Sequence, residues 1–295
     1  MLHVAHILCL VAPGSAAPAH AFFLTRRLDA TLHVLPHPLL AEPEDGEGRM
    51  EALRAEDEGV PVPTERPADL PASMTEVLRY VEGRGIDLVL TDTPSDRGAV
   101  PPLAVEATRT LVRQLSCPVF VVEHEGTPAA LRNLLVPTDL SDPSLCAFQH
   151  AVNLARLYDA AVHVLHVVDS PPYVALTPTD RLSFGPHPLS EHRGRRRLRA
   201  FLGDEEAADV PLHAHLTYGD PADQIPRFAD QTDTDLVVLA SHGPESSPNT
   251  PLGQVAARVL GRMTRPLFLV RASGASLLPP SAEGESESSS GEPTA

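Results

Sequence analysis

Two glycines in the C-terminal half of the chain have the type and position best suited to phosphate chemistry. Gly253 precedes an expected helix over residues 254–263, and the amides at a helix N-terminus carry partial positive charge that attracts anions. Gly243 follows an apolar run and has no side chain, so the backbone there can approach a ligand closely. A loop that only packs against its neighbours is the alternative, and it stays open.

Histidines offer a second kind of chemistry, the binding of a metal ion. His163, His213 and His215 alternate with apolar residues, as half-exposed positions on strands do. His213 and His215 would share one strand face, but no third ligand is evident, so no protein metal site is predicted. The three cysteines lack metal-ligand spacing and are expected to be small buried groups in a reducing compartment. They are Cys9, Cys117 and Cys146.

Patterns typical of enzymes are not evident. The sequence has no nucleophile elbow, no Walker-type Gly-Lys-Ser/Thr and no pair of carboxylates spaced to activate water. We therefore predict no catalytic residue, and slow ATP hydrolysis stays open. A dense arginine run at 193–199 is expected to be a solvated helix face that balances the acidic residues 204–206.

Composition limits the classes of protein to consider. The 295 residues are enough for about two domains, and 42% of them are hydrophobic. The formal net charge of −16 argues against general nucleic-acid binding, which needs a basic face. No apolar run approaches the ~18 residues of a membrane-spanning helix, and the run 7–11 is interpreted as a first strand rather than a signal peptide. We expect a cytoplasmic protein without nucleic-acid or membrane partners.

The chain repeats itself. Segment 27–35 is similar to segment 156–165, with one inserted residue between them. An Asp-Leu-Val pattern begins at Asp87 and again at Asp235, and each is followed by an apolar run opened by a proline. Both prolines lie 31 residues on, since 118 − 87 = 31 and 266 − 235 = 31. Two matches in the same order predict a duplicated domain.

Strand and helix patterns alternate along the second half, and Ser141 can cap the first helix. The expected strands are residues 134–136, 162–168, 212–217, 236–240 and 267–270. The expected helices are residues 144–158, 188–202, 222–231 and 254–263. Such alternation predicts parallel βαβ units with helices on both faces of a sheet, an α/β fold. The first half follows the same plan, interrupted by the Pro- and acid-rich residues 42–67.

Four segments of the second half resemble the universal stress protein family. They are Leu134-Leu-Val-Pro-Thr-Asp-Leu-Ser-Asp-Pro-Ser144, Val164-Leu-His-Val-Val-Asp169, Gly219-Asp-Pro221, and Leu236-Val-Val-Leu-Ala-Ser-His-Gly243 followed by Gly253. The resemblance implies two Rossmann-like domains in tandem, each a doubly wound, five-stranded, mostly parallel sheet. It also implies ATP at the carboxyl edge of the second sheet, where open α/β sheets bind ligands.

The resemblance also names the residues around a nucleotide. The family's phosphate motif is Gly, two residues, Gly, nine residues, Gly and then Ser or Thr. The matching positions are Ala240, Gly243, Gly253 and Gln254, with Ser241 and His242 inside the loop. The spacing is kept, but Ala240 adds a methyl group and Gln254 replaces a hydroxyl, so weakened phosphate binding is implied.

For the adenosine part, the resemblance implies contacts from Pro137, Asp139 and the backbone of Val167. Asp139 as the N-terminal cap of the following helix is the alternative, because aspartate is a favoured cap. His166, next to Val167, is expected to be packed in the sheet. His242 lies in the loop and is expected to be more exposed.

The chain is divided into three regions. Residues 1–126 are predicted to be a degenerate domain of this kind, 131–272 a domain with a partial ATP motif, and 273–295 a disordered acidic tail. In the first half Thr91 or Asp92 aligns with Ala240, and a carboxylate there would repel phosphate, so this half is interpreted as a structural partner. We expect an intrachain pseudo-dimer that pairs strands near 118–122 and 266–270, and a homodimer is also compatible.

Two functions remain. The first is an adenine-nucleotide-responsive stress or signalling protein that binds ATP or AMP weakly, with no metal beyond nucleotide-associated Mg²⁺. The second is a nucleotide-independent interaction scaffold. The retained Asp139, Gly243 and Gly253 favour the first, and the departures at Ala240 and Gln254 favour the second.

Overall fold

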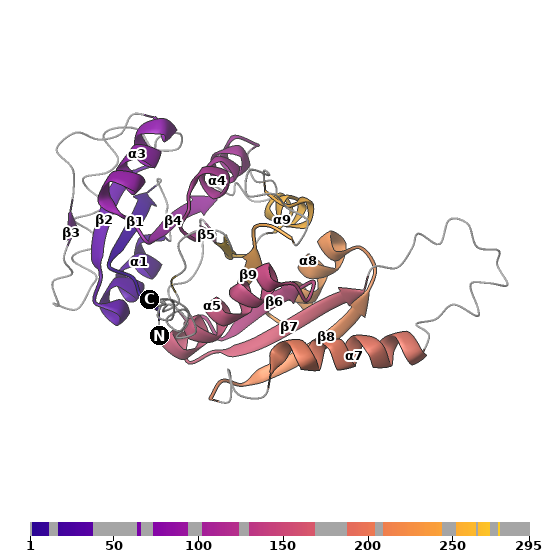
Figure 1. Ribbon diagram of the computed structural model, residues 1–295. Coiled ribbons are helices and arrows are strands. Elements are labelled where there is room, and N and C mark those ends of the chain that lie inside the picture. Colours follow the sequence, from indigo (N-terminus) through magenta and orange to yellow (C-terminus); the bar gives the residue numbers. More distant parts are fainter. Residues whose placement is uncertain are drawn as a thin grey trace, which may run out of the picture.

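Strands alternate with helices in both halves of the chain (Figure 1). The computed structural model describes residues 2–11, 17–37, 64–65, 73–93, 102–123, 130–168, 188–203, 209–243, 252–263, 265–271 and 277. The first half contains β1 (His6–Val11), α1 (Ala17–Leu28), β2 (Thr31–Pro36), β3 (Thr64–Glu65), α3 (Met74–Arg84), β4 (Leu88–Thr93), α4 (Pro102–Gln114) and β5 (Val119–Glu123). Of the interrupted region 42–67, only β3 lies among the described residues.

The second half has the elements that the sequence predicts. They are β6 (Asn133–Thr138), α5 (Asp142–Tyr158), β7 (Ala161–Val168), α7 (Pro188–Leu202), β8 (Leu212–Tyr218), α8 (Pro221–Gln231), β9 (Leu236–Ala240), α9 (Gln254–Leu260) and β10 (Leu267–Val270). α5 begins at Asp142, before the predicted residue 144, with Ser141 as its N-cap. α9 stops short of the predicted residue 263, because Gly261 forms its C-cap and donates its N–H to the Ala257 carbonyl.

The described strands form a single ten-stranded sheet in the order β3-β2-β1-β4-β5-β10-β9-β6-β7-β8. Within each half the pairs are parallel, and the halves meet where β5 and β10 pair antiparallel. The α/β fold with two five-stranded, mostly parallel halves is therefore confirmed. The pairing near 118–122 and 266–270 is found as expected, with Phe120 opposite Phe268 and their ring centroids 5.7 Å apart.

The repeat in the structure needs no inserted residue. α1 and α5 are each followed by an aspartate with positive φ, Asp29 at 53° and Asp159 at 55°. The next residue donates to the carbonyl of Thr25 in one half and of Ala155 in the other. Counting back from the two aspartates, Arg26 rather than Arg27 matches Arg156. The predicted insertion is therefore wrong, because it came from aligning the wrong arginine of an adjacent pair.

Both faces of the sheet carry a hydrophobic core that runs through both halves. One core includes buried side chains of α1, α5 and α7, and the other includes those of α3, α4, α8 and α9. Phe120 and Phe268 lie in the first core, and Val119 and Leu267 in the second. The halves are thus joined through the sheet and through both cores. No helix among the described residues is long and apolar enough to cross a membrane.

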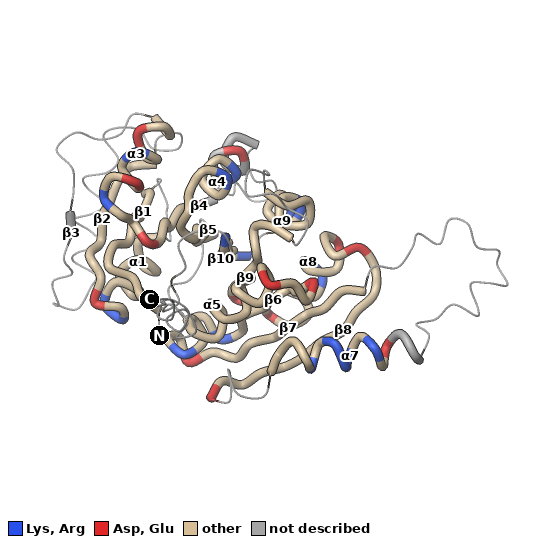
Figure 2. Tube along the Cα trace, in the orientation of Figure 1, with Lys and Arg blue, Asp and Glu red and all other residues tan. Residues whose placement is uncertain are grey.

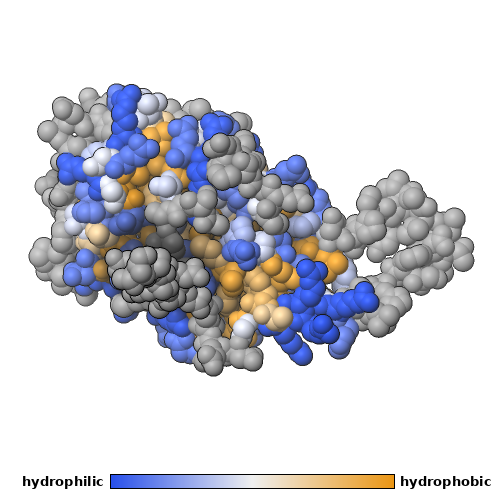
Figure 3. Space-filling view, viewed as in Figure 1, coloured by the Kyte–Doolittle hydropathy of each residue, from blue (hydrophilic) through white to orange (hydrophobic). Residues whose placement is uncertain are grey.

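The arginine run lies on α7, which packs along the edge strand β8 and its neighbour β7. Gly194, Leu198 and Leu202 form the buried stripe of this helix, and Arg195 pairs with Glu191. The other arginines of the run are exposed. Figure 2 marks arginine positions in blue along α7, and Figure 3 shows hydrophilic residues over the same helix. The acidic residues 204–206 that were expected to balance them lie outside the described residues.

The predicted tail is docked at one described residue. Leu277 is 1% exposed, its N–H donates to Nε2 of His150 at 3.3 Å, and its carbonyl accepts from the N–H of His3 at 2.7 Å. The expectation that everything beyond Ala272 is undocked is therefore wrong at Leu277. Leu277 joins the core that also contains Leu2, Val4 and side chains of α5, a contact that composition alone does not reveal. Residues 278–295 lie outside the described residues.

Candidate functional site

A cavity of about 400 Å³ opens at the carboxyl ends of β6, β7 and β9. Its lining includes all nine residues that the sequence analysis proposed for a nucleotide. They are Pro137, Asp139, Val167, Ala240, Ser241, His242, Gly243, Gly253 and Gln254. Because they come from four separate segments of the chain, the fold has brought them together at the edge expected for an open α/β sheet.

The cavity also has lining residues that the sequence analysis did not propose. Leu165 and Leu239 extend the apolar wall from β7 and β9, and Pro221 and Ile225 close it from α8. The Gly219-Asp-Pro turn was the available signal for Pro221, since a turn after a parallel strand lies at this edge. Whether the other side chains line the cavity depends on where each strand ends. The apolar runs in the sequence do not define those ends.

Asp139 lies directly after β6 and stabilises the turn into α5. Its Oδ1 accepts from the N–H of Ser141 at 3.1 Å and from the Ser141 hydroxyl. The N-cap of α5 is Ser141, so the alternative that Asp139 is the cap is wrong. Oδ2 makes no hydrogen bond with any described residue, and a Cβ built on Gly243 would lie 3.6 Å from it. This oxygen is therefore an acceptor directed toward the loop that follows β9.

The backbone and side chain of Ser241 make hydrogen bonds within the protein itself. It is 0% exposed, its N–H donates to the Val270 carbonyl, and its carbonyl accepts from the N–H of Gly253, both at 2.8 Å. Its hydroxyl lies 2.7 Å from Nδ1 of His242. Ser241 thus joins β10, the loop and the start of α9, and its side chain serves to orient the half-buried His242 ring.

Gly253 is required for a close approach between two backbones. A Cβ at this position would lie 3.3 Å from the Ser241 carbonyl oxygen and 3.5 Å from the His242 Cα. Its own N–H already donates to Ser241, so this amide does not point a free donor at a phosphate. The glycine holds α9 against the loop, and its contact with a phosphate stays a prediction. Gly243 has the more open position.

His166 lines the cavity, although it was expected only to be packed. Its Nδ1 lies 2.8 Å from the Thr138 carbonyl oxygen. A carbonyl only accepts, so Nδ1 donates the proton of this hydrogen bond. The Thr138 hydroxyl in turn lies 2.8 Å from that of Ser144, which also lines the cavity. Sequence reasoning missed these residues because the register between β6 and β7 decides what they meet.

The first half carries a carboxylate at the position of Ala240. Asp92 pairs with Val122 of β5 as Ala240 pairs with Val270 of β10, which selects Asp92 over Thr91. Asp92 is 1% exposed and its Oδ1 accepts from the N–H of Ala17, the first residue of α1. Burial, and next the charge of Asp92, raise the pKa of the Cys9 thiol.

The three strand histidines do meet. Nδ1 of His163 lies 3.1 Å from Nε2 of His215, and the rings of His163 and His213 are 4.9 Å apart. Partial burial, followed by these two neighbours, lowers the pKa of His163. No group of three or more His, Cys, Asp or Glu in the described part of the chain is arranged to hold a metal ion. His163 lies on β7 and meets His213 and His215 through the register of β7 with β8, which sequence spacing does not define.

Known proteins match the second half by sequence and the whole chain by fold. The model of the universal stress protein family matches residues 130–271. A universal stress protein of Methanocaldococcus jannaschii is 33% identical over 140 residues, which are 48% of this chain and 82% of that protein. Universal stress protein G of Salmonella typhimurium is 26% identical over 144 residues, 48% of this chain and 99% of that protein.

Two solved structures cover both halves. A universal stress protein from Archaeoglobus fulgidus matches with a TM-score of 0.58 and 17% identity, covering 91% of this chain and 96% of that one. A Pseudomonas aeruginosa protein described as functionally unknown matches with a TM-score of 0.63 and 18% identity, covering 93% and 94%. At these identities the similarity is one of fold.

Proposed function

This chain belongs to the universal stress protein family, and we propose that it is an adenine-nucleotide-responsive protein that binds ATP or AMP in its second half, residues 131–272. The observation that carries the proposal is the shared cavity: nine residues chosen from the sequence line it together. Its volume of about 400 Å³ lies within the range of about 300–1,000 Å³ typical of small-molecule pockets.

The cavity has an apolar end and a polar end, as an adenine nucleotide requires. Pro137, Leu165 and Val167 form the apolar end, which suits the adenine ring. Oδ2 of Asp139 is an acceptor for a ribose hydroxyl. The loop at His242 and Gly243, with the side chain of Gln254, would meet the phosphates, and Mg²⁺ would arrive with the nucleotide.

The affinity should be low for this family. Ala240 carries a methyl group where the motif has glycine, Gln254 lacks the hydroxyl, and the amide of Gly253 is already bonded to Ser241. A lost hydrogen bond to a charged group costs about 1.5–3 kcal/mol, or roughly one to two decades in affinity. We expect weaker nucleotide binding than in family members that have the intact motif.

We assign the first half, residues 1–126, the role of structural partner. The buried carboxylate of Asp92 lies where Ala240 lies in the second half, and it already bonds to the start of α1. A negative charge there would repel a phosphate. The proposal therefore includes one nucleotide per chain.

The second candidate is a nucleotide-independent interaction scaffold. The observation that favours it is the bond from Gly253 to Ser241, which uses one amide of the phosphate loop within the fold itself. Saturation-transfer NMR with millimolar ATP and AMP separates the two functions. Nucleotide binding predicts strong saturation of the adenine protons, which would lie against Pro137 and Val167. If no saturation is transferred to either nucleotide, the nucleotide-independent interaction scaffold is the function that remains.

A further inference from the structure

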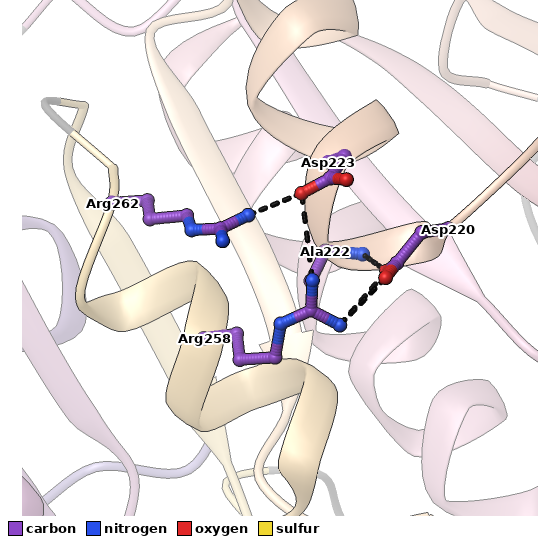
Figure 4. A network of polar contacts seen from close by, with 5 residues as sticks. All are labelled: Asp220, Ala222, Asp223, Arg258 and Arg262. Atoms are coloured by element: carbon purple, nitrogen blue, oxygen red, sulfur yellow. Dashed lines mark hydrogen bonds and ion pairs between the residues drawn. The ribbon is translucent and has the colours of Figure 1, made fainter.

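An ion-pair network joins α8 to α9 beside the cavity (Figure 4). Nη1 of Arg258 donates to both carboxylate oxygens of Asp220, at 3.0 and 2.8 Å. Nη2 of Arg258 reaches Oδ1 of Asp223 at 3.5 Å, and Arg262 pairs with the same oxygen. Two carboxylates of the α8 start are thus held by two guanidinium groups of the α9 segment.

The network ties together two walls of the cavity. Asp220 is the N-cap of α8, and the next residue, Pro221, lines the cavity. Arg258 lies about one turn after Gln254, which also lines the cavity. Asp220 and Arg258 therefore link α8 to α9 beside the cavity.

α9 depends on such outside contacts for its position. It spans only Gln254–Leu260, too short to be stable on its own. On its other side Arg109 of α4 donates to the Ala257 carbonyl at 3.3 Å, a second tether that comes from the first half. The buried Val259 and Leu260 fix the inner face of α9 against the core. The Asp220–Arg258 pair acts at the outer, solvent-exposed side.

The network is poorly placed to add much stability. The side chains of Asp220 and Arg258 are both 43% exposed, and exposed pairs contribute little to folding. The hydrogen bond from Arg258 is nonetheless the first cause that lowers the pKa of the Asp220 carboxyl. The pair is therefore charged at neutral pH and geometrically defined, which suits positioning better than stabilisation.

We propose that the Asp220–Arg258 pair is a latch that positions α9, and with it the side chain of Gln254, for the phosphate end of a bound nucleotide. This inference rests on the proposed function. The adenosine end lies against β6, β7 and the start of α8, and the buried Ala222 and Ile225 hold α8 in the core independently of the latch. Opening the latch should thus weaken ATP binding and spare adenosine binding.

The test compares Asp220→Asn, Arg258→Gln and the double variant in the full chain. Asparagine keeps an acceptor for the N–H of Ala222, now 2.9 Å from Oδ1 of Asp220, so the cap of α8 survives while the charge is removed. Dissociation constants for ATP and adenosine are measured by calorimetry. Each single variant should weaken ATP binding about two- to fivefold, the double no further, and adenosine binding should not change.

Arg156→Gln is the matched control. Arg156 also donates two hydrogen bonds to a carboxylate: its Nε and Nη2 lie 2.8 and 2.7 Å from the oxygens of Asp209. Neither Arg156 nor Asp209 lines the cavity. This variant should bind ATP as the wild type does. Unchanged ATP affinity in Arg258→Gln, or an equal loss for adenosine, would overturn the latch and leave nucleotide binding intact. A wild-type chain that binds neither ligand would overturn the proposed function, and the latch with it.

Discussion

Asp87 and Asp235 are structural counterparts that make the same two contacts in the two halves of the chain. Oδ2 of Asp87 accepts from the N–H groups of Ala5 and His6 at 2.7 and 3.0 Å. Oδ2 of Asp235 accepts from those of Arg132 and Asn133 at 2.8 and 2.9 Å. Each aspartate thereby joins the end of one loop to the start of the first strand of its half.

Replacing either aspartate by alanine should destabilise the whole molecule. Each variant leaves two backbone N–H groups without their carboxylate, so the free energy of unfolding should fall by about 2 kcal/mol. Because the sheet and both cores run through the two halves, denaturant unfolding should stay a single transition. Asp209→Ala, at an exposed carboxylate, should lower the free energy of unfolding by clearly less. Two separate transitions, or an equal loss from Asp209→Ala, would contradict this.

Acid should weaken the fold through His20. This residue is 3% exposed, its Nδ1 has no partner among the described groups, and burial lowers its pKa from 6.5 to about 4. The unfolded chain therefore binds a proton at a pH where the folded one does not. Above pH 6.5 His20 is neutral in both states and does not reduce the free energy of unfolding. As the pH falls from 6.5 toward 4, the free energy of unfolding drops by up to about 3 kcal/mol.

His20→Leu should remove that part of the pH dependence. Stability measured by urea unfolding at several pH values should fall less steeply between pH 6.5 and 4 in the variant. Burial also lowers the pKa values of His37 and His150, and their contribution to the pH dependence of stability is the same in both proteins. If the free energy of unfolding depends on pH in the same way in the variant and the wild type, protonation of His20 does not destabilise the fold and the prediction is wrong.

Two truncations of the tail, one that keeps Leu277 and one that removes it, should differ in stability. A chain that ends after residue 278 keeps the buried Leu277, whereas one that ends after Ala272 loses it together with the bonds to His150 and His3. The shorter chain should lose about 2–5 kcal/mol, the range for deleting a buried leucine side chain, and the longer one almost nothing. Thermal melting curves measure both. Equal melting temperatures would place Leu277 outside the cooperative fold.

Restoring the phosphate motif should tighten binding. Ala240→Gly combined with Gln254→Ser returns a methyl-free loop and a hydroxyl at the cavity wall. ATP affinity in calorimetry should rise by roughly one to two decades, the value of a hydrogen bond to a charged group. Adenosine, which lacks the phosphates, should bind as before. An equal gain for adenosine would mean that the substitutions act on cavity shape instead.

Much of the fold is local in origin and was therefore predictable. The limits of α7, β9 and β10 match the predicted ranges 188–202, 236–240 and 267–270. Apolar periodicity is a property of neighbouring residues, so it needs no knowledge of tertiary contacts. The α9 end was missed because Gly261 stops the helix before the apolar pattern ends.

The site was predictable in its residues but not in their bonds. Family-like spacing selected Asp139, Gly243 and Gly253, which line one cavity. The partner of each group lies far along the chain or across a strand register. Examples are the Gly253 amide on Ser241 and the Arg258 guanidinium on Asp220. Such pairs are decided by tertiary packing, which a single sequence does not encode in its spacing.

Gly243 allows the most direct test of nucleotide binding. A Cβ there makes only an ordinary contact, 3.6 Å from Oδ2 of Asp139, so Gly243→Leu should fold and direct its side chain into the cavity. Gly83→Leu is the matched control, because a Cβ at Gly83 on α3 meets nothing within 4 Å. Calorimetric titration with ATP should give one site per wild-type chain, the same for Gly83→Leu, and none for Gly243→Leu. Undiminished binding by Gly243→Leu, two sites per chain, or no heat at millimolar ATP in the wild type would contradict a nucleotide site in this cavity.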